Sequence, residues 1–358
     1  MDYNSYRRKS RPVLVGGVGI GGTYPISVQS MTNTSPYDYE ATYRQISALS
    51  EAGCDIVRLA IPDIEAAAVI AEMKRRGVKL PLVADIHFDY RIALAAIEAG
   101  ADKIRINPGN IGSRERTEAV VRACKERDIP IRIGVNSGSL EKSLLEKYGA
   151  PCARALADSA LYHAEILREL DFDKILISVK ASSVAEMIEA NRILARETDY
   201  PLHLGVTEAG ARERAAVKSA VGIGSLLSVG IGDTVRVSLT EDPVREVYLA
   251  REILGTLSLT ENRGMDIVSC PTCGRTKIDL IALVEEFEKK VKENRLDGKN
   301  IKVALMGCVV NGPGEAREAD IGIAGGIGEG LLFKKGKTVR KIREDRLVDE
   351  LIEEIKLM

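Results

Sequence analysis

The sequence predicts an α/β protein with a closed (β/α)8 barrel of the TIM type followed by a small α+β domain. Between residues 25 and 252, eight short apolar segments alternate with amphipathic helical segments, which is typical of a parallel sheet. Eight such strands within roughly 230 residues favour a closed barrel over an open, doubly wound sheet. After residue 252 the alternation stops, and about a hundred residues with a different order of elements follow.

The predicted strands of the barrel alternate with helices along the chain. They are residues 25–31, 55–61, 82–87, 103–108, 131–136, 174–180, 202–208 and 234–240. The segments between them, such as 38–53, 64–77 and 114–128, carry apolar residues at helical spacing. Residues 13–25, VLVGGVGIGGTYP, precede the first strand and predict a hairpin that closes the lower end of the barrel. Their glycines do not precede a helix, which argues against a phosphate-binding loop.

We expect the barrel to occupy residues 1–252, a connector residues 253–269, and a second domain residues 270–358. In the second domain, the pattern predicts helices at 277–296 and 343–357. Strands are predicted there at 301–306, 320–325 and 329–335. A domain of this size buries little apolar surface, so a cofactor that cross-links it is plausible.

Composition excludes several classes of protein. The formal net charge is -1 over 358 residues, which argues against nucleic acid or a membrane surface as the main partner. The N-terminus is not followed by an apolar segment typical of a signal peptide, and no run of 18 apolar residues is present. We therefore expect a cytoplasmic protein with no membrane contact.

The six cysteines do not indicate a disulfide framework. Cys54, Cys124 and Cys152 stand alone and are interpreted as ordinary thiols that pack like small apolar residues. The remaining three belong to two short motifs, SCPTCG at 269–274 and MGCVVNGPGEA at 306–316.

Those two motifs predict a metal centre. Cys270 and Cys273 form a CxxC pair, and Cys308 offers a third thiolate. The Gly-Pro-Gly turn after Cys308 allows Glu315 to fold back toward it. Zinc would require a fourth ligand from a second CxxC or from histidines, and all three histidines of the chain lie in the predicted barrel. A redox-active CxxC would leave Cys308 and Glu315 unexplained. Three thiolates and an oxygen ligand fit a [4Fe–4S] cluster, which spacing alone favours over zinc.

Polar residues gather at the carboxyl ends of the predicted strands, where TIM barrels place their chemistry. Most of them occur in pairs two or four residues apart, so both members of a pair point into the barrel. They are Arg58, Asp85, His87, Arg105, Asn107, Arg132, Asn136, Ser178, Lys180, Glu208, Arg236 and Ser238. So many converging cations would be costly without an anion, and guanidinium groups bind phosphate oxygens in pairs. We expect a small phosphate or diphosphate ester as substrate, with Glu208 as a candidate general acid and His87 as a candidate donor.

Seven stretches of sequence together resemble the 4-hydroxy-3-methylbut-2-enyl diphosphate synthase family. They are VQSMTNT, ADIHF, KIRINPGN, IRIGVNSGSL, LLSVGIGDTVRVSLT, SCPTCGR and MGCVVNGPGEA. The resemblance covers the whole chain in its short two-domain form. It implies an oxidoreductase of the non-mevalonate isoprenoid pathway that reductively opens 2-C-methyl-D-erythritol 2,4-cyclodiphosphate to the linear allylic diphosphate. Electrons would arrive one at a time from flavodoxin or ferredoxin through a [4Fe–4S] cluster.

The resemblance also implies roles for individual residues. Cys270, Cys273, Cys308 and Glu315 would be the cluster ligands. Asp85 and Glu208 match the acidic residues of the family, with Glu208 as the proton donor. The cradle for the substrate and its diphosphate would consist of Arg58, His87, Arg105, Asn107, Arg132, Asn136, Lys180, Arg236 and Ser238.

The connector bears on the oligomeric state. The last helix of a TIM barrel ends at the face opposite the active site. Residues 253–269 would therefore have to span the full height of the barrel before a cluster could reach the active site of its own subunit. A head-to-tail homodimer, in which each cluster domain caps the barrel of the partner, removes this difficulty, and the resemblance implies the same arrangement.

Two alternatives remain open from the residues. One is a phosphate-ester barrel enzyme, an aldolase or pterin-type transferase, with a structural zinc module. The other is a non-enzymatic redox sensor or cluster carrier, which would leave the arginine-lined mouth unexplained.

Overall fold

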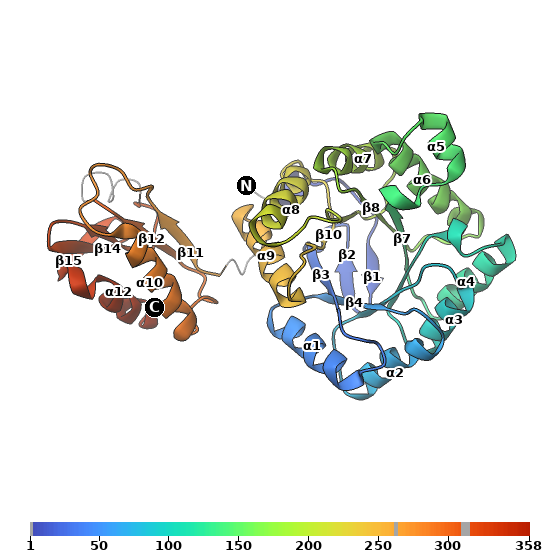
Figure 1. Ribbon diagram of the computed structural model, residues 1–358, viewed down its shortest axis with the longest axis horizontal. Coiled ribbons are helices and arrows are strands. Elements are labelled where there is room, and N and C mark those ends of the chain that lie inside the picture. Colours follow the sequence, from blue (N-terminus) through green and yellow to red (C-terminus); the bar gives the residue numbers. More distant parts are fainter. Residues whose placement is uncertain (1–2, 261–263, 309–315) are drawn as a thin grey trace. The chain divides into compact units, whose positions relative to one another are not determined.

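The structure is a computed structural model that describes residues 3–260, 264–308 and 316–358. The chain divides into two compact units, residues 1–260 and 261–358, which are described separately. Figure 1 shows the first unit as a ring of helices around a barrel of strands, and the second as a sheet with helices. No helix among the described residues is long and apolar enough to cross a membrane.

The first unit contains an eight-stranded parallel barrel. The strands are β3 (Ser27–Met31), β4 (Ile56–Ala60), β5 (Leu82–Asp85), β6 (Lys103–Ile106), β7 (Ile131–Asn136), β8 (Ile175–Lys180), β9 (His203–Leu204) and β10 (Thr234–Val235). Each pairs in parallel with its neighbour in the chain, and β10 pairs with β3. A parallel bridge between Ile177 and Leu202 joins β8 to β9 and completes the ring. The predicted (β/α)8 barrel is confirmed.

Helices surround this barrel (Figure 1). They are α1 (Tyr39–Glu51), α2 (Ala68–Arg75), α3 (Tyr90–Glu98), α4 (Arg114–Glu126), α5 (Lys142–Tyr148), α6 (Ala153–Glu169), α7 (Val184–Glu197), α8 (Arg212–Leu227) and α9 (Pro243–Thr256). Short 3₁₀ helices occur at Tyr3–Ser5, Glu65–Ala67, Pro108–Asn110 and Ser137–Ser139. The carboxylates of Asp38, Asp89 and Asp242 accept backbone N–H bonds at the starts of α1, α3 and α9, which satisfies donors that have no partner within the helix.

Alternate strand residues point outward and pack beneath the helices. Val57, Leu59, Ile104, Ile131 and Ile133 are fully or almost fully buried in this outer layer. The residues between them point into the barrel, where many are polar. This alternation follows from the two-residue period of a strand and separates the apolar core from a polar interior.

A two-stranded hairpin closes the amino-terminal end of the barrel. Its strands are β1 (Val13–Val15) and β2 (Val18–Ile20). Val13, Val15 and Ile20 form an apolar cluster with Ile56, Val83 and Leu176, which are inward residues near the starts of β4, β5 and β8. The interior of the barrel is therefore sealed at this end, as the sequence predicted.

The seventh and eighth strands are shorter than predicted. Regular pairing in β9 stops at Leu204, and Glu208 lies in the following loop with a left-handed backbone at φ 53°. Just beyond this end, the backbone at Gly205 passes close to the segment after β10, because a Cβ on residue 205 would lie 2.5 Å from the carbonyl oxygen of Arg236. Only glycine fits at this position.

The second unit is built on a five-stranded sheet in the order β11-β12-β13-β14-β15. The strands are β11 (Asp266–Ser269), β12 (Lys302–Met306), β13 (Ile321–Gly325), β14 (Glu329–Lys334) and β15 (Lys337–Arg343), and the first three are parallel. Helices α10 (Leu280–Glu293) and α12 (Leu347–Lys356) pack on the sheet through Phe287, Leu351 and Ile355, and a 3₁₀ turn spans Glu344–Arg346.

Two details of this unit differ from the sequence prediction. The predicted connector 253–269 contains the last turn of α9 and all of β11, which pairs with β12. Strand β15 was not predicted, because only Ile342 of its seven residues is buried and the apolar alternation is absent. It is held instead by its antiparallel pairing with β14.

Candidate functional site

The carboxyl ends of the barrel strands bring cationic side chains together around one aspartate. Asp85, at the end of β5, lies between Arg58 of β4 and Arg105 of β6. Its Oδ2 is 3.6 Å from Arg58 Nε, and its Oδ1 is 3.3 Å from Arg105 Nη1. Burial alone would raise the pKa of Asp85, but the charges of Arg58, Arg105 and Arg132 outweigh it and lower the pKa to about 2. Asp85 is therefore ionised and holds two arginines in position.

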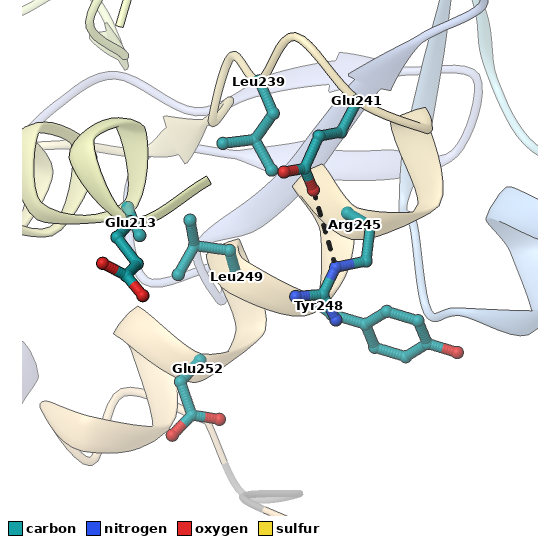
Figure 2. A pocket seen from close by; sticks show the side chains of 8 residues that line it. Glu213, Leu239, Glu241, Arg245, Tyr248, Leu249 and Glu252 are labelled. Atoms are coloured by element: carbon teal, nitrogen blue, oxygen red, sulfur yellow. Dashed lines mark ion pairs between the residues drawn. The ribbon is translucent and has the colours of Figure 1, made fainter. Parts of the chain in front are cut away.

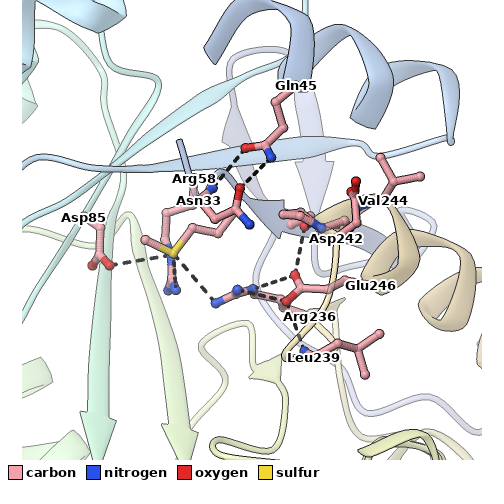
Figure 3. Close-up of polar contacts among 12 residues, drawn as sticks. Asn33, Gln45, Arg58, Asp85, Arg236, Leu239, Asp242, Val244 and Glu246 are labelled. Carbon is pink, nitrogen blue, oxygen red and sulfur yellow. Dashed lines mark hydrogen bonds and ion pairs between the residues drawn. The ribbon is translucent and has the colours of Figure 1, made fainter. Parts of the chain in front are cut away.

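Arg58 and Arg236 approach the same region from β4 and from the segment after β10 (Figure 3). Arg58 donates to the Met31 sulfur at 3.0 and 2.9 Å. Arg236 donates to both carboxylate oxygens of Glu246 at 3.2 Å, and Glu246 is fixed in turn by the Ser30 hydroxyl at 2.9 Å. Burial lowers the pKa of Arg58 to about 10, so it remains a cation at neutral pH.

Arg132 and Lys180 add charge without a carboxylate of their own. Arg132 is 1% exposed, and its Nε and Nη1 have no hydrogen-bond partner among the described residues. Burial and the neighbouring cations lower the pKa values of both side chains. Five basic side chains thus lie near only two carboxylates, Asp85 and Glu246, and this excess of basic groups is the defining electrostatic feature of the mouth. An anion would satisfy it.

Two glycines make room for these cations. A Cβ on Gly134 would lie 2.2 Å from Arg105 Nε, and one on Gly205 would lie 2.7 Å from Lys180 Nζ. Arg105 also donates to the Gly134 carbonyl at 3.0 Å, and Asn107 Oδ1 accepts the Gly134 N–H at 3.1 Å. The backbone of β7 therefore fixes the orientation of both residues from β6.

A hollow of about 440 Å³ opens beside these residues. Its lining consists of His87, Phe88, Arg105, Asn107, Asn110, Asn136, Gly138 and Leu140. His87 is largely exposed, with its Nδ1 3.3 Å from Arg105 Nη1 and its Nε2 3.9 Å from Asp85. The volume and the polar lining suit a small, charged ligand.

Not all predicted site residues join this cluster. The Ser178 hydroxyl donates a hydrogen bond to the Ile133 carbonyl oxygen, at 3.4 Å, inside the barrel. Ser238 is half-buried three residues beyond β10. Glu208 is exposed in the loop between β9 and α8, and the described contacts do not connect it to Asp85 or the arginines.

Sequence reasoning missed Glu246 and Lys103. Glu246 lies on α9 rather than on a strand, and only the three-dimensional structure brings it to Arg236. Lys103 is the first residue of β6, two positions before Arg105 and thus on the same inward face. It is fully buried. The alternation of β6 could have identified it, since Lys103, Arg105 and Asn107 share one parity.

A second hollow, of about 570 Å³, lies outside the barrel between α8 and α9 (Figure 2). Three glutamates, Glu213, Glu241 and Glu252, line it together with Arg245 and Tyr248. This acidic lining is less suited to a phosphate ester than the basic side chains at the mouth of the barrel are.

In the second unit, the cysteines lie at one edge of the sheet. Cys270 directly follows β11, and Cys308 comes two residues after β12, its parallel neighbour. The N–H of Gly307 donates to Cys270 Sγ at 3.2 Å, and the N–H of Lys277 donates to the Gly307 carbonyl at 3.2 Å. The CxxC loop and the start of the Cys308 loop are therefore hydrogen-bonded to each other.

The electrostatics of the thiols differ between the two units. Hydrogen bonds from the backbone and side chain of Arg275 lower the pKa of Cys273. In the barrel, burial raises the pKa of Cys54 to about 11 and that of Cys124 to about 12. Of these three cysteines, Cys273 has its pKa shifted toward the thiolate that a metal ligand requires, whereas Cys54 and Cys124 have theirs shifted away from it.

The thiol donors and the N–H bond to Cys270 fit an iron–sulfur cluster, although the described residues do not form a closed set of ligands. Among them, no three histidine, cysteine, aspartate or glutamate side chains are grouped as a metal site. Glu315, the predicted fourth ligand, lies outside the described residues. All three histidines are in the barrel unit, so the second unit has no imidazole with which to complete a zinc site.

Comparisons with known proteins agree over almost the whole chain. A model described as the GcpE TIM-barrel domain matches residues 10–251, and one described as the GcpE protein C-terminal domain matches residues 266–357. A curated relative from Clostridium perfringens is 60% identical over 97% of this chain and 98% of its own length. One from Bacillus subtilis is 56% identical over 99% of this chain and 93% of its own length. Both are named 4-hydroxy-3-methylbut-2-en-1-yl diphosphate synthase (flavodoxin).

Two solved structures share the fold of about 70% of this chain. Dihydropteroate synthase from Vibrio fischeri ES114 has a TM-score of 0.51 at 12% identity, over 70% of this chain and 100% of that one. Dihydropteroate synthase from Xanthomonas albilineans with 7,8-dihydropteroate has a TM-score of 0.50 at 15% identity, over 70% of this chain and 98% of that one. At such identities the likeness concerns architecture and not activity.

Proposed function

Since the chain belongs to the GcpE family, we propose that it reductively opens 2-C-methyl-D-erythritol 2,4-cyclodiphosphate to 4-hydroxy-3-methylbut-2-enyl diphosphate. It is then an oxidoreductase acting on CH or CH2 groups, and the names of its relatives favour flavodoxin as electron donor, with ferredoxin as the other candidate. The observation that carries the proposal is the excess of basic side chains at the barrel mouth, in a chain whose Cys270 and Cys308 follow two neighbouring strands of the second unit.

The barrel mouth binds the diphosphate. Arg58, Arg105, Arg132, Lys180 and Arg236 supply the positive charge, while Asp85 and Glu246 hold three of the arginines in position. Further donors around the substrate would be His87, Asn107, Asn136 and Ser238. Because the five cations are already assembled, binding requires little reorganisation, which favours affinity.

The second unit holds the cofactor. Cys270, Cys273, Cys308 and Glu315 would bind a [4Fe–4S] cluster. The cluster, when bound, supplies electrons one at a time and a Lewis-acidic iron. The N–H of Gly307 donates to Cys270 Sγ, and hydrogen bonds from Arg275 lower the pKa of Cys273. The reduced thiols that such a centre requires favour a cytoplasmic location.

Glu208 is proposed to deliver the proton with which the substrate hydroxyl leaves as water. It follows β9 at the carboxyl end of the barrel and is accessible to solvent, so it can be reprotonated after each turnover. Its left-handed backbone, at φ 53°, is a conformation that non-glycine residues rarely adopt and that is enriched at functional sites.

We further propose a homodimer in which the cluster domain of each subunit serves the barrel of the other. Arg251, near the end of α9, donates to the Gly53 carbonyl and to Asp55, both of which precede β4. The last helix therefore ends at the plugged face of the barrel. Residues as far as Leu259 remain hydrogen-bonded to that helix end.

The chain length supports this arrangement. Six residues, 260–265, remain before β11 begins at Asp266, and they span at most about 22 Å. The 14 residues of α9 form a helix about 21 Å long, which measures the height of the barrel wall. Running back along that height would use the full length of residues 260–265. Nothing would be left to cross the helix layer toward the mouth.

The test is anaerobic reconstitution with iron and sulfide, followed by turnover of the cyclodiphosphate with reduced flavodoxin or a chemical reductant. Formation of the linear diphosphate supports the proposal. Protein that contains zinc and no sulfide, and that converts no cyclodiphosphate, would favour the phosphate-ester transferase instead. A cluster-loaded protein that binds no diphosphate would favour a redox sensor.

A further inference from the structure

His163 is a fully buried histidine on α6 that the proposed function does not use. Its two ring nitrogens contact different loops. Nδ1 accepts the backbone N–H of Gly109 at 3.2 Å. Nε2 lies 2.6 Å from Oε1 of Glu141, a close approach that falls short of ideal hydrogen-bond geometry. One imidazole thus contacts the loops that follow two neighbouring strands, β6 and β7.

The loop after β6 carries two residues of the hollow at the barrel mouth. Gly109 is the middle residue of the 3₁₀ turn Pro108–Asn110. Asn107 and Asn110, on either side of it in the chain, line the hollow of about 440 Å³, and the Asn110 N–H donates to the Asn107 carbonyl at 2.9 Å. The hydrogen bond from Gly109 to His163 therefore anchors the turn that carries both lining residues.

The ring of His163 and this turn are in close contact. A Cβ on residue 109 would lie 2.6 Å from Cε1 of the ring and 3.3 Å from Nδ1, which is too close for any residue other than glycine. Glycine is the residue that allows backbone to approach another group this closely. The residue at position 109 is therefore matched to the histidine.

The loop after β7 lines the same hollow. Asn136, Gly138 and Leu140 form part of its wall, and Glu141 follows them directly in the chain. Oε1 of Glu141 also accepts a hydrogen bond from the Ser159 hydroxyl at 3.1 Å. Ser159 and His163 are four residues apart on α6 and thus share one face of that helix. Glu141 is therefore contacted by two buried side chains of the same helix face.

The contact with Gly109 determines where a neutral imidazole carries its proton. Because Nδ1 accepts an N–H, it has no proton of its own, so the proton is on Nε2, which faces Glu141. A proton on Nδ1 would instead place two N–H groups against each other. The ring accepts from one loop and presents its N–H to the other.

We propose that His163 is a positioning residue for the barrel mouth, holding the loops after β6 and β7 in the arrangement in which their asparagines line the diphosphate site. The inference rests on the proposed function, which supplies the ligand. His163 is not among the residues that line the hollow, so it acts through the two loops. Groups that are already in place lose less conformational freedom when a ligand binds, so loosening these loops should lower affinity.

The experiment removes the two ring nitrogens separately. His163→Asn retains an oxygen near the position of Nδ1, and His163→Gln retains an amide N–H near that of Nε2. His163→Leu removes both polar atoms. Asn191→Leu is the matched control, since Asn191 is also fully buried on a helix of the outer ring, where it donates to the Val179 and Met187 carbonyls of β8 and α7.

Binding of inorganic diphosphate to cluster-loaded protein is measured by calorimetry, and KM and kcat for the cyclodiphosphate are measured by turnover. His163→Leu should bind diphosphate about tenfold more weakly and raise KM. Its kcat should change little, because the proposed proton donor and cluster ligands are untouched. His163→Asn and His163→Gln should each restore part of the affinity. Asn191→Leu should lower the unfolding temperature and bind diphosphate as wild type does.

Gly109→Ala tests the same contact from an exposed position, where loss of folding is not expected. The added Cβ should force the turn away from the ring and weaken diphosphate binding, as His163→Leu does. His163→Ala vacates the space that this Cβ requires. The double variant Gly109→Ala/His163→Ala should therefore bind no more weakly than His163→Ala alone, a coupling that two independent defects would not show.

Unchanged affinity in Gly109→Ala and in folded His163→Leu would overturn the inference. So would an equal loss of affinity in Asn191→Leu, since the effect would then follow from the loss of any buried polar side chain. Additive effects of Gly109→Ala and His163→Ala would also contradict it. The inference and the proposed function fail separately, because His163-dependent binding of inorganic diphosphate in a protein that converts no cyclodiphosphate would refute only the function.

Discussion

At the scale of single residues, Asp85 illustrates how the mouth stays charged. One carboxylate with a pKa of about 2 orients two arginines and remains too weak a base to be neutralised at physiological pH. Removing it would leave buried guanidinium groups without compensation, which is more costly than the pair itself is favourable. The site therefore combines a carboxylate that orients two arginines with basic side chains whose remaining N–H groups can donate to a ligand.

The proposed ligands of the cluster should differ in how firmly they hold it. We expect Glu315→Ala to retain a labile cluster on three thiolates, whereas Cys308→Ser should lose most of its iron and sulfide, because thiolate binds iron more firmly than carboxylate does. Iron and sulfide are determined after anaerobic reconstitution and again after exposure to a chelator. Equal retention in the two variants would argue against Glu315 as the exchangeable ligand.

The role of Glu208 can be separated from binding. Glu208→Gln keeps the size of the side chain and removes the proton, so diphosphate affinity should stay near that of wild type while kcat falls about 10²–10⁴-fold. The measurements are a binding titration with inorganic diphosphate and steady-state turnover of the cyclodiphosphate. A variant with near wild-type turnover would require another proton donor.

The residues show what the sequence could and could not predict. Arg58, Arg105 and Arg132 were predictable because a strand places alternate residues on one face; Arg105 and Arg132 pair in register on β6 and β7, and Arg58 lies on β4, one strand beyond β5. Glu246 was not, since it reaches Arg236 from a helix and no local pattern indicates that contact. Lys103 was overlooked although its parity indicated an inward position, because it lies at the start of β6 and not at its end.

At the scale of elements, β7 contributes to the site through Gly134, which has no side chain and so leaves space for Arg105. Because Arg105 occupies the space where a Cβ of residue 134 would lie, Gly134→Ala should displace the guanidinium from Asp85 and from the Gly134 carbonyl. We expect diphosphate affinity to fall at least about tenfold, or ~1.4 kcal/mol, in a protein that still folds.

Gly224→Ala is the control for that substitution. Gly224 lies within α8, where an added Cβ meets nothing within 4 Å, so the change should leave affinity unaltered and stabilise the fold by about 0.5–1 kcal/mol. Binding is followed by calorimetry and unfolding by circular dichroism. If both variants bind diphosphate equally well, the space at Gly134 is not required for the site.

Element boundaries were the part of the fold that the sequence predicted least well. The alternation of strands and helices was sufficient for the barrel, yet β9 and β10 contain only two residues each. Their predicted lengths relied on apolar alternation, whereas the close approach of Gly205 to the Arg236 carbonyl depends on a contact between segments about thirty residues apart. β15 escaped prediction because only Ile342 of its residues is buried, so its sequence lacks apolar alternation although it pairs with β14.

At the scale of the whole molecule, the homodimer can be tested by complementation. A Cys308→Ser subunit and a Glu208→Gln subunit, each nearly inactive alone, are mixed under conditions that exchange subunits. If the cluster of each subunit serves the other barrel, every heterodimer has one intact site, and activity should recover to about one quarter of wild type.

Subunit exchange is verified independently, for example with subunits that carry different affinity tags. Should exchange be complete and activity remain absent, each cluster must serve its own barrel. Mixing wild-type protein with either variant is the control for effects of dilution.

The hairpin of β1 and β2 has a consequence for turnover. Because Val13, Val15 and Ile20 fill the amino-terminal end of the barrel, the described residues leave no second exit there. A product bound at the mouth would have to leave through the opening by which the next substrate arrives, and both would carry the diphosphate that we propose the arginines bind. Accumulated product should therefore raise the apparent KM for the cyclodiphosphate and leave the maximal rate unchanged, so that the enzyme slows as its own output builds up.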